Sequence, residues 1–168
     1  MIGPRKPRAP RRQPAVAQPS VAAVAGVDDP QPLFVAAIAV RWRDLDAFNH
    51  VNNSTFLTYL EEARLQWLAT VPGPWFDEHA MPVLAASTLN YRAPISWPGA
   101  LRVELTRGRA GSSSLALAHR VIDAADPTRL YCDGEVVMVW MDPASGRSVP
   151  LPQAIRDACA GPAPGDPR

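Results

Sequence analysis

The most informative part of the sequence for the fold is VRWRDLDAFNHVNNSTFLTYLEEARLQWLATV, from Val40 to Val71. It begins at the end of a run rich in β-formers, continues through a segment dense in Asp, Asn and His, and ends with apolar residues at helical spacing. A helix N-terminus carries unpaired backbone N–H groups and a partial positive charge, so it favours anions and developing oxyanions. The polar residues placed ahead of this terminus are Asp46, His50, Asn52 and Asn53. Proton-exchanging side chains beside such donors are what attack on an activated carbonyl requires.

The helix is predicted to begin near Asn52 or Ser54, either of which is a capping residue, and to end before Pro72-Gly73-Pro74. Its apolar stripe is Phe56, Leu60, Ala63 and Trp67, widened by Leu57 and Leu68. The opposite side carries Thr58, Glu62, Leu65 and Gln66. At about five turns, the helix is long enough to be the central helix of a domain wrapped by a sheet.

Strand patterns lie on both sides of this helix. One strand is expected at 33–42 before it, and four are expected after it at 83–97, 101–106, 115–121 and 130–141, followed by a short helix at 152–159. An antiparallel sheet covering one long helix is an α+β architecture. The chain has no G-x-G-x-x-G after a strand and no P-loop, which argues against nucleotide-binding folds.

Composition divides the 168 residues into one domain with two tails. Residues 1–31 are rich in Pro, Ala and Arg and are expected to be a disordered tail, residues 32–160 form the domain, and residues 161–168 are a flexible end. The formal charge of +1 gives no reason to expect a nucleic-acid partner. No apolar run approaches the ~18 residues of a spanning helix, so no membrane insertion is expected.

The two cysteines, Cys132 and Cys159, match no metal-binding spacing and no disulfide framework. We expect free structural thiols in a reduced, cytoplasmic setting, with no metal and no cofactor.

The segment RWRDLDAFNHVNNSTFLTYLEEAR, residues 41–64, resembles the hotdog-fold thioesterases, and most of all the branch with 4-hydroxybenzoyl-CoA thioesterase and related bacterial acyl-CoA thioesterases. Its specific part is D-x-D-x-x-x-H-V-N-N in front of the helix, and the resemblance covers roughly residues 34–141. The G-S-S-S at 111–114 fits a turn of that family. The resemblance implies a sheet curled around the helix, a homodimer or dimer of dimers, and an active site at the dimer interface.

The same resemblance assigns roles to residues. Asp46 corresponds to the catalytic carboxylate, and a backbone amide near Asn53 corresponds to the group that holds the thioester oxygen. His50 is a third candidate for the catalytic set. Two positions depart from relatives: the residue before His50 is often Gly and is Asn49 here, and the plant acyl-carrier-protein thioesterases tend to have Asn where this chain has Phe48.

The spacing of these residues alone is also compatible with purely structural roles for their side chains. Asp46 could be a turn or capping residue, or it could act as general base or nucleophile. His50 could orient Asp46, contact substrate or pack against the loop. Asp44 would point to the opposite face and pair with Arg41 or Arg43 as a structural residue.

Two further groups of residues invite a functional interpretation. Glu61 and Glu62 look like a catalytic pair, but the i, i+3 spacing of Glu61 and Arg64 favours an ordinary ion pair. The residues that could hold coenzyme A phosphates are Arg107, Arg109, Ser112 and Ser113. The tryptophans predicted to build the core, or to line an acyl tunnel, are Trp42, Trp67, Trp97 and Trp140.

The sequence therefore predicts a homo-oligomeric hydrolase of acyl-CoA thioesters that uses Asp46 and a helix-terminal amide. An enzyme that takes acyl groups from acyl carrier protein is one alternative, and it would need a basic rim. A non-catalytic acyl-binding subunit is another. A hotdog dehydratase is less well supported, because the residues around His50 do not match the hydratase motif.

Overall fold

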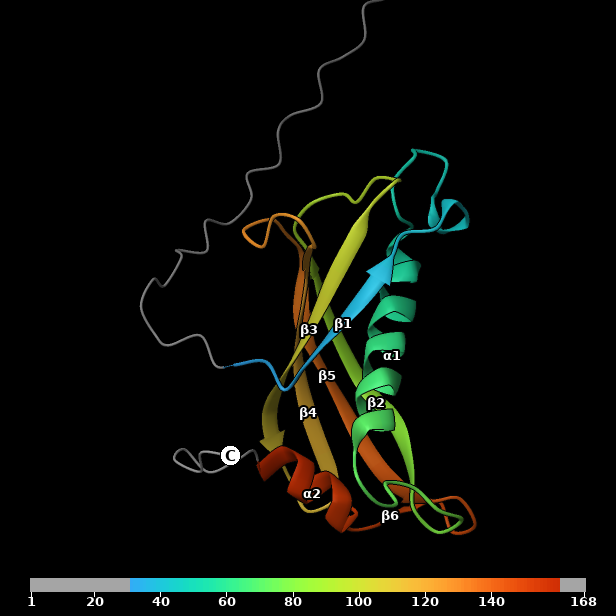
Figure 1. The fold of residues 1–168 in the computed structure, drawn as a ribbon. Coiled ribbons are helices and arrows are strands. Elements are labelled where there is room, and N and C mark those ends of the chain that lie inside the picture. The colour runs from blue at the N-terminus through green and yellow to red at the C-terminus, as the bar shows by residue number, and fades with distance from the viewer. Residues whose placement is uncertain (1–30, 161–168) are drawn as a thin grey trace, which may run out of the picture.

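The computed structural model describes residues 31–160, which form one antiparallel sheet and one long helix (Figure 1). The five main strands lie in the order β1-β3-β4-β5-β2, and a short β6 pairs with β5. The strands are β1 (Phe34–Ala39), β2 (Met81–Tyr91), β3 (Ala100–Ala110), β4 (Ser114–Asp123), β5 (Leu130–Asp142) and β6 (Arg147–Ser148). Every pairing is antiparallel.

The long helix α1 (Asn53–Thr70) lies along one face of the sheet, and the short helix α2 (Gln153–Ala160) lies across one end of it (Figure 1). The predicted α+β class and the order of strand, long helix and four strands are confirmed. An antiparallel sheet wrapped around one helix is the hotdog arrangement. The predicted capping is confirmed as well, because Asn52 is the N-cap and its side chain accepts a hydrogen bond from the Ser54 amide at 2.9 Å.

The face of α1 that packs on the sheet is broader than the predicted stripe. Most of the stripe is buried as expected, but Leu57 is 43% exposed, so its assignment to the core was wrong. Tyr59 and Arg64 are buried instead. Helical periodicity shows which residues share a face, but the width and position of the sheet decide how much of that face is covered.

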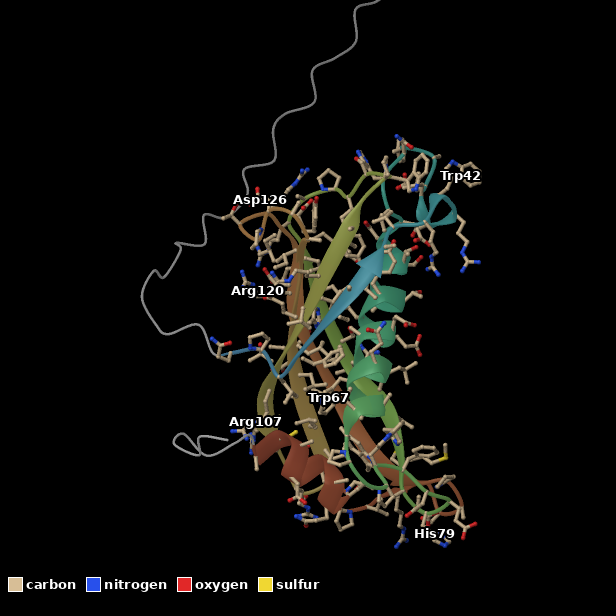
Figure 2. All side chains as sticks on the ribbon, in the orientation of Figure 1. Trp42, Trp67, His79, Arg107, Arg120 and Asp126 are labelled. Atoms are coloured by element: carbon tan, nitrogen blue, oxygen red, sulfur yellow. The ribbon has the colours of Figure 1, made fainter. Side chains whose placement is uncertain are left out.

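The prediction that four tryptophans build the core is half right. Trp67, on α1, is buried against the sheet (Figure 2). Trp140 is fully buried. Trp42 is 74% exposed and Trp97 is 48% exposed. Both exposed rings belong to connecting segments rather than to strands or to α1, so no opposite layer covers them.

Two predicted strands are shorter than expected. The strand expected at 33–42 ends at Ala39, and the strand expected at 83–97 ends at Tyr91. In the second case Pro94 and Pro98 have no amide to donate to a ladder. The carbonyl of Ile95 instead accepts the Val51 amide at 2.8 Å, which ties this segment to the loop before α1.

The two edges of the sheet differ in length and exposure. Strand β2 has eleven residues, is paired on one side by β5, and is exposed along most of its length. Its exposed apolar residues are Met81, Val83, Leu84 and Tyr91. Strand β1 has six residues at the other edge. Within residues 31–160, β2 therefore presents a long unpaired edge with an apolar character.

Several other predictions can be compared with the structure. Both cysteines are free and buried. Within the described residues, no helix is long and apolar enough to cross a membrane, and no cluster of His, Cys, Asp or Glu could hold a metal. The tail predicted for residues 1–31, except its last residue, and the flexible end predicted for 161–168 lie outside the described residues.

Candidate active site

The loop before α1 closes into a tight turn around Asp46. Leu45 and Val51 form an antiparallel bridge, and the Asp46 amide donates to the His50 carbonyl at 2.7 Å. The Asp46 Oδ1 accepts the amides of Phe48 at 2.8 Å and of His50 at 3.3 Å. One carboxylate oxygen is thus held by the turn, while Oδ2 has no hydrogen-bond partner among residues 31–160. The side chain is fixed in place and still offers one open oxygen.

The turn explains the departure at Asn49. This residue has φ 61°, in the left-handed region that glycine adopts without strain and that asparagine tolerates better than most residues. Asparagine can therefore occupy this position of the turn at little conformational cost.

The other aspartate of the motif, Asp44, is a structural residue, as predicted. It is buried, and its carboxylate accepts the Arg41 amide at 2.8 Å, the Arg41 Nε at 3.1 Å and the Tyr59 hydroxyl at 2.7 Å. Burial opposes its ionisation, but the hydrogen bonds from Arg41 and Tyr59 outweigh burial and lower its pKa. The pairing with Arg41 is confirmed.

The three predicted catalytic residues line one cleft of about 280 Å³, which we call the polar cleft. It is bounded by Asp46, His50, Val51, Asn53, Phe56, Tyr91, Arg92, Ala93 and Pro94. The loop before α1, the first turn of α1 and the end of β2 all contribute to it. Asp46, His50 and Asn53 are thus brought together by the fold.

The start of α1 presents a donor to this cleft. Because Asn52 is the N-cap, Asn53 is the first helical residue, and its amide has no hydrogen-bond partner among the described residues. Such an amide at the positive end of a helix can stabilise a developing oxyanion. The polar cleft therefore contains both a proton acceptor, the Asp46 carboxylate, and a hydrogen-bond donor, the Asn53 amide.

Sequence reasoning missed Tyr91. Its hydroxyl donates to the Asn53 carbonyl at 3.0 Å, and its ring packs edge-on against Phe56 with centroids 5.1 Å apart. Burial raises its pKa. A tyrosine in an alternating strand looks like a packing residue, and only the pairing of β2 with β5 brings it to the helix start, 38 residues away in the chain.

The predicted ion pair on α1 does not form. Glu62 is exposed and accepts a hydrogen bond from Gln66 at 2.9 Å, and Glu61 is exposed too. Arg64 is only 8% exposed and makes no ion pair with any residue in 31–160. Both residues line the same cleft, but the Arg64 side chain is buried while that of Glu61 is exposed.

Arg64 lines a second cleft, of about 270 Å³, between α1 and β2. We call it the apolar cleft, because its walls are mostly hydrophobic and include Leu65, Leu68, Trp75, Phe76, Met81 and Leu84. It lies toward the C-terminal half of α1, whereas the polar cleft lies at the N-terminus.

The residues predicted to hold coenzyme A lie at the other end of the protomer. Arg107 donates to the Cys159 carbonyl beside α2 (Figure 2), and Arg109 lines a separate cleft with Ser114. Ser112 and Ser113 use their carbonyls to accept the Leu151 and Trp140 amides. Strand β3 starts near the Asp46 loop and rises ~3.3 Å per residue, so Arg107 and Arg109 lie about 25 Å away.

A family model describing the thioesterase-like superfamily matches residues 40–159. This range contains the Asp46 loop, α1 and all the strands after it. The match therefore covers both clefts and most of the chain.

Several individual proteins are similar to this chain. The PA2801 protein of Pseudomonas aeruginosa is 41% identical, with a TM-score of 0.69 over 76% of this chain and 98% of that one. A thioesterase from Thermus thermophilus, complexed with coenzyme A and Zn, is 33% identical, with a TM-score of 0.66 over 77% of this chain and 93% of that one. The long-chain acyl-CoA thioesterase FadM of Escherichia coli is 26% identical over 122 residues, 71% of this chain and 92% of its own length.

Proposed function

The chain belongs to the thioesterase-like superfamily, and on that basis we propose that it hydrolyses acyl-CoA thioesters in the polar cleft. The observation that carries the proposal is the open Oδ2 of Asp46 beside the unpaired amide of Asn53. The activity named for FadM and the coenzyme A bound to the Thermus relative support the choice of substrate.

In the proposed reaction, the Asn53 amide holds the thioester oxygen and stabilises the negative charge that develops on it. Asp46 takes a proton from a water molecule, and the oxygen of that water attacks the carbonyl carbon. The tetrahedral intermediate then expels the coenzyme A thiolate, which takes up the proton. Because a thiol has a pKa near ~8.5, it leaves without a strong acid catalyst. A single carboxylate is therefore enough.

Direct attack by Asp46 on the thioester, forming an anhydride, uses the same geometry. The two routes differ in where the oxygen of water ends up. In a single turnover in H₂¹⁸O, water that attacks the Asp46 carbonyl of an anhydride leaves ¹⁸O in the protein, whereas the general-base route puts all of it in the free acid. Mass spectrometry that finds ¹⁸O in the peptide containing Asp46 therefore establishes the anhydride route.

We propose that the active enzyme is a homodimer, or a dimer of dimers, joined along β2. Support comes from the long unpaired edge of β2 and from its exposed apolar residues, which form an unusually apolar surface for an edge strand. The separation of about 25 Å between Asp46 and the predicted phosphate-binding arginines adds to this, because Arg107 and Arg109 reach an Asp46 site only if it belongs to another protomer.

The test of the proposed function is thiol release from acyl-CoAs of short, long and aromatic chains, by wild type and Asp46→Asn. We expect saturable hydrolysis by wild type and a loss of about 10³-fold in kcat in the variant, within the range for general bases. Asparagine keeps the Oδ1 acceptor, so the turn and the thermal midpoint should be preserved. Equal rates would exclude Asp46 as the catalytic group, and absence of hydrolysis by wild type would favour a non-catalytic acyl-binding protein.

A further inference from the structure

Arg64 is a buried cation without a counter-ion. It is 8% exposed, it lines the apolar cleft, and it makes neither a hydrogen bond nor an ion pair within residues 31–160. A guanidinium group withdrawn from water loses hydration that only charge-paired or hydrogen-bonded contacts replace. Buried charged groups that lack such contacts occur at functional clefts, where a ligand can supply them.

Two carboxylates in this part of the protein, Glu61 and Asp133, do not pair with Arg64. Glu61 lines the same cleft, where burial lowers the pKa of Arg64 and the charge of Glu61 opposes this, but no ion pair joins the two side chains within residues 31–160. Asp133 is bound by Arg92 at 2.7 Å and by Asn90 at 2.9 Å. Arg64 therefore has no directly bonded counter-ion among residues 31–160.

His119, a residue of the sheet on which the charge of Arg64 acts, does not supply the missing anion either. His119 lies on β4, 2% exposed, with neither ring nitrogen hydrogen-bonded among the described residues. Burial, together with the charge of Arg64, lowers the pKa of His119 to about 4, so its ring is neutral at pH 7. Gly134 makes the room for this ring, because a side chain there would lie 3.0 Å from the His119 Nε2 and collide with the Thr88 carbonyl.

We propose that Arg64 is a specificity determinant that binds a carboxylate at the far end of the acyl group, in the apolar cleft. The inference rests on the proposed thioesterase function and names its substrate class: CoA thioesters of dicarboxylic acids. The apolar walls accept the methylene chain, and the guanidinium pairs with the terminal carboxylate through two parallel hydrogen bonds.

The position of the cleft on β2 fits this role in the proposed dimer. The polar cleft contains Tyr91 at one end of β2, and the apolar cleft contains Met81 at the other. Antiparallel pairing of two copies of β2 about the middle of the strand brings the Met81 end of one protomer beside the Tyr91 end of the other. The acyl chain then runs from Asp46 of one protomer toward Arg64 of its partner. Within one protomer the two sites are separated along α1 by about 16 Å, at ~1.5 Å per residue.

The test compares matched substrates that differ only in the terminal carboxylate: succinyl-, adipoyl- and suberoyl-CoA against butyryl-, hexanoyl- and octanoyl-CoA. For wild type we expect kcat/KM at the best chain length to favour the dicarboxylic substrate at least tenfold. Arg64→Met should reverse that preference, and Arg64→Lys should reduce it at least threefold, because an ammonium group lacks the paired donors of Arg. The control is Arg102→Met, which removes an arginine that pairs with Glu104 on β3 and should leave the preference unchanged.

The outcomes separate this inference from the proposed function. Hydrolysis of the monocarboxylic substrates without a preference for the dicarboxylic ones overturns the role of Arg64 and leaves the thioesterase intact. No hydrolysis of any of the six overturns both. If Arg64→Met lowers both substrate series equally and also weakens the dimer, Arg64 pairs with the partner protomer and not with substrate. If Arg64→Met does not fold, the wild-type preference and Arg64→Lys still decide the question.

Discussion

The two flanks of α1 differ in character. On the β1 side, a cleft is lined by polar groups that include Thr58, Glu62 and Gln66. On the β2 side, Leu57 and Leu65 are 43% and 52% exposed. One flank of α1 is therefore polar and faces water, whereas the other exposes apolar side chains.

The two aspartates of the D-x-D sequence follow the same division. Asp44 lies with Arg41 and Tyr59 on the β1 side, where its carboxylate accepts hydrogen bonds from both residues. Asp46 opens to the polar cleft beside Tyr91, at the end of β2. This contrast supports the proposal that the β2 flank receives a second protomer and a substrate, while the β1 flank contributes to stability.

The largest difference between the flanks is expected when a glutamate is introduced on each of them in turn. Leu57→Glu should give a monomer and lower thiol release about a hundredfold, because an unpaired carboxylate would be buried in the dimer interface. Thr58→Glu, one residue away on the β1 side, should leave the mass and the rate unchanged. Light scattering and the thiol-release assay measure both. A dimeric, fully active Leu57→Glu would rule out this face as the interface.

Asp44→Asn tests whether the β1 flank is structural. Loss of the charge-assisted bonds to Arg41 and Tyr59 should lower the free energy of unfolding by about 2 kcal/mol, with kcat of the folded protein nearly unchanged. Urea unfolding measures the first and thiol release the second. A large loss of kcat without a loss of stability would place Asp44 in the chemistry.

The pH dependence of the same pair sharpens this point. The pKa of Asp44 is lowered from its ordinary 3.8 in the folded state. Its contribution is therefore fully present above that value and is lost as pH falls through the lower, folded pKa. The stability difference between wild type and Asp44→Asn should shrink as pH falls below about 4. A difference that stays constant down to about pH 2 would show that the charge of Asp44 is not what stabilises the fold.

Tyr91→Phe removes one hydrogen bond at the polar cleft. Loss of the contact with the Asn53 carbonyl should cost about 1 kcal/mol and lower kcat/KM three- to tenfold, because the helix start that carries the donor is held less firmly. The comparison of kcat/KM with the thermal midpoint separates positioning from stability. An unchanged kcat/KM would show that Tyr91 only packs against Phe56.

The smallest effect is expected from Glu61→Gln. Glu61 lies beside the apolar cleft but far along α1 from Asp46, so hydrolysis of hexanoyl-CoA should change less than twofold. Glu62→Gln, on the β1 side, is the matched control. A hundredfold loss in Glu61→Gln alone would transfer the role of catalytic base from Asp46 to the helix glutamate.

The sequence alone was enough to predict the long helix, its cap at Asn52 or Ser54, the succession of helix and strands along the chain, and the proximity of Asp46, His50 and Asn53. These features depend on contacts within a few residues along the chain, where turn chemistry, capping and helical periodicity act. The prediction that Asp44 is structural was right for a wrong reason, because residues i and i+2 of a strand share a face and Trp42–Asp44 form a 3-10 helix instead.

The tertiary structure alone decided the burial of Arg64, the exposure of Trp42 and Trp97, and the arrival of Tyr91 at the start of α1. Each of these features depends on the register and extent of the sheet. The strands of the sheet are far apart in the chain, so neighbouring residues do not reveal how they pair. Arginine at an i, i+3 spacing from glutamate looks like a surface ion pair. The position of the sheet beneath α1 buries Arg64 in a cleft, where it has no ion-pair partner among the described residues.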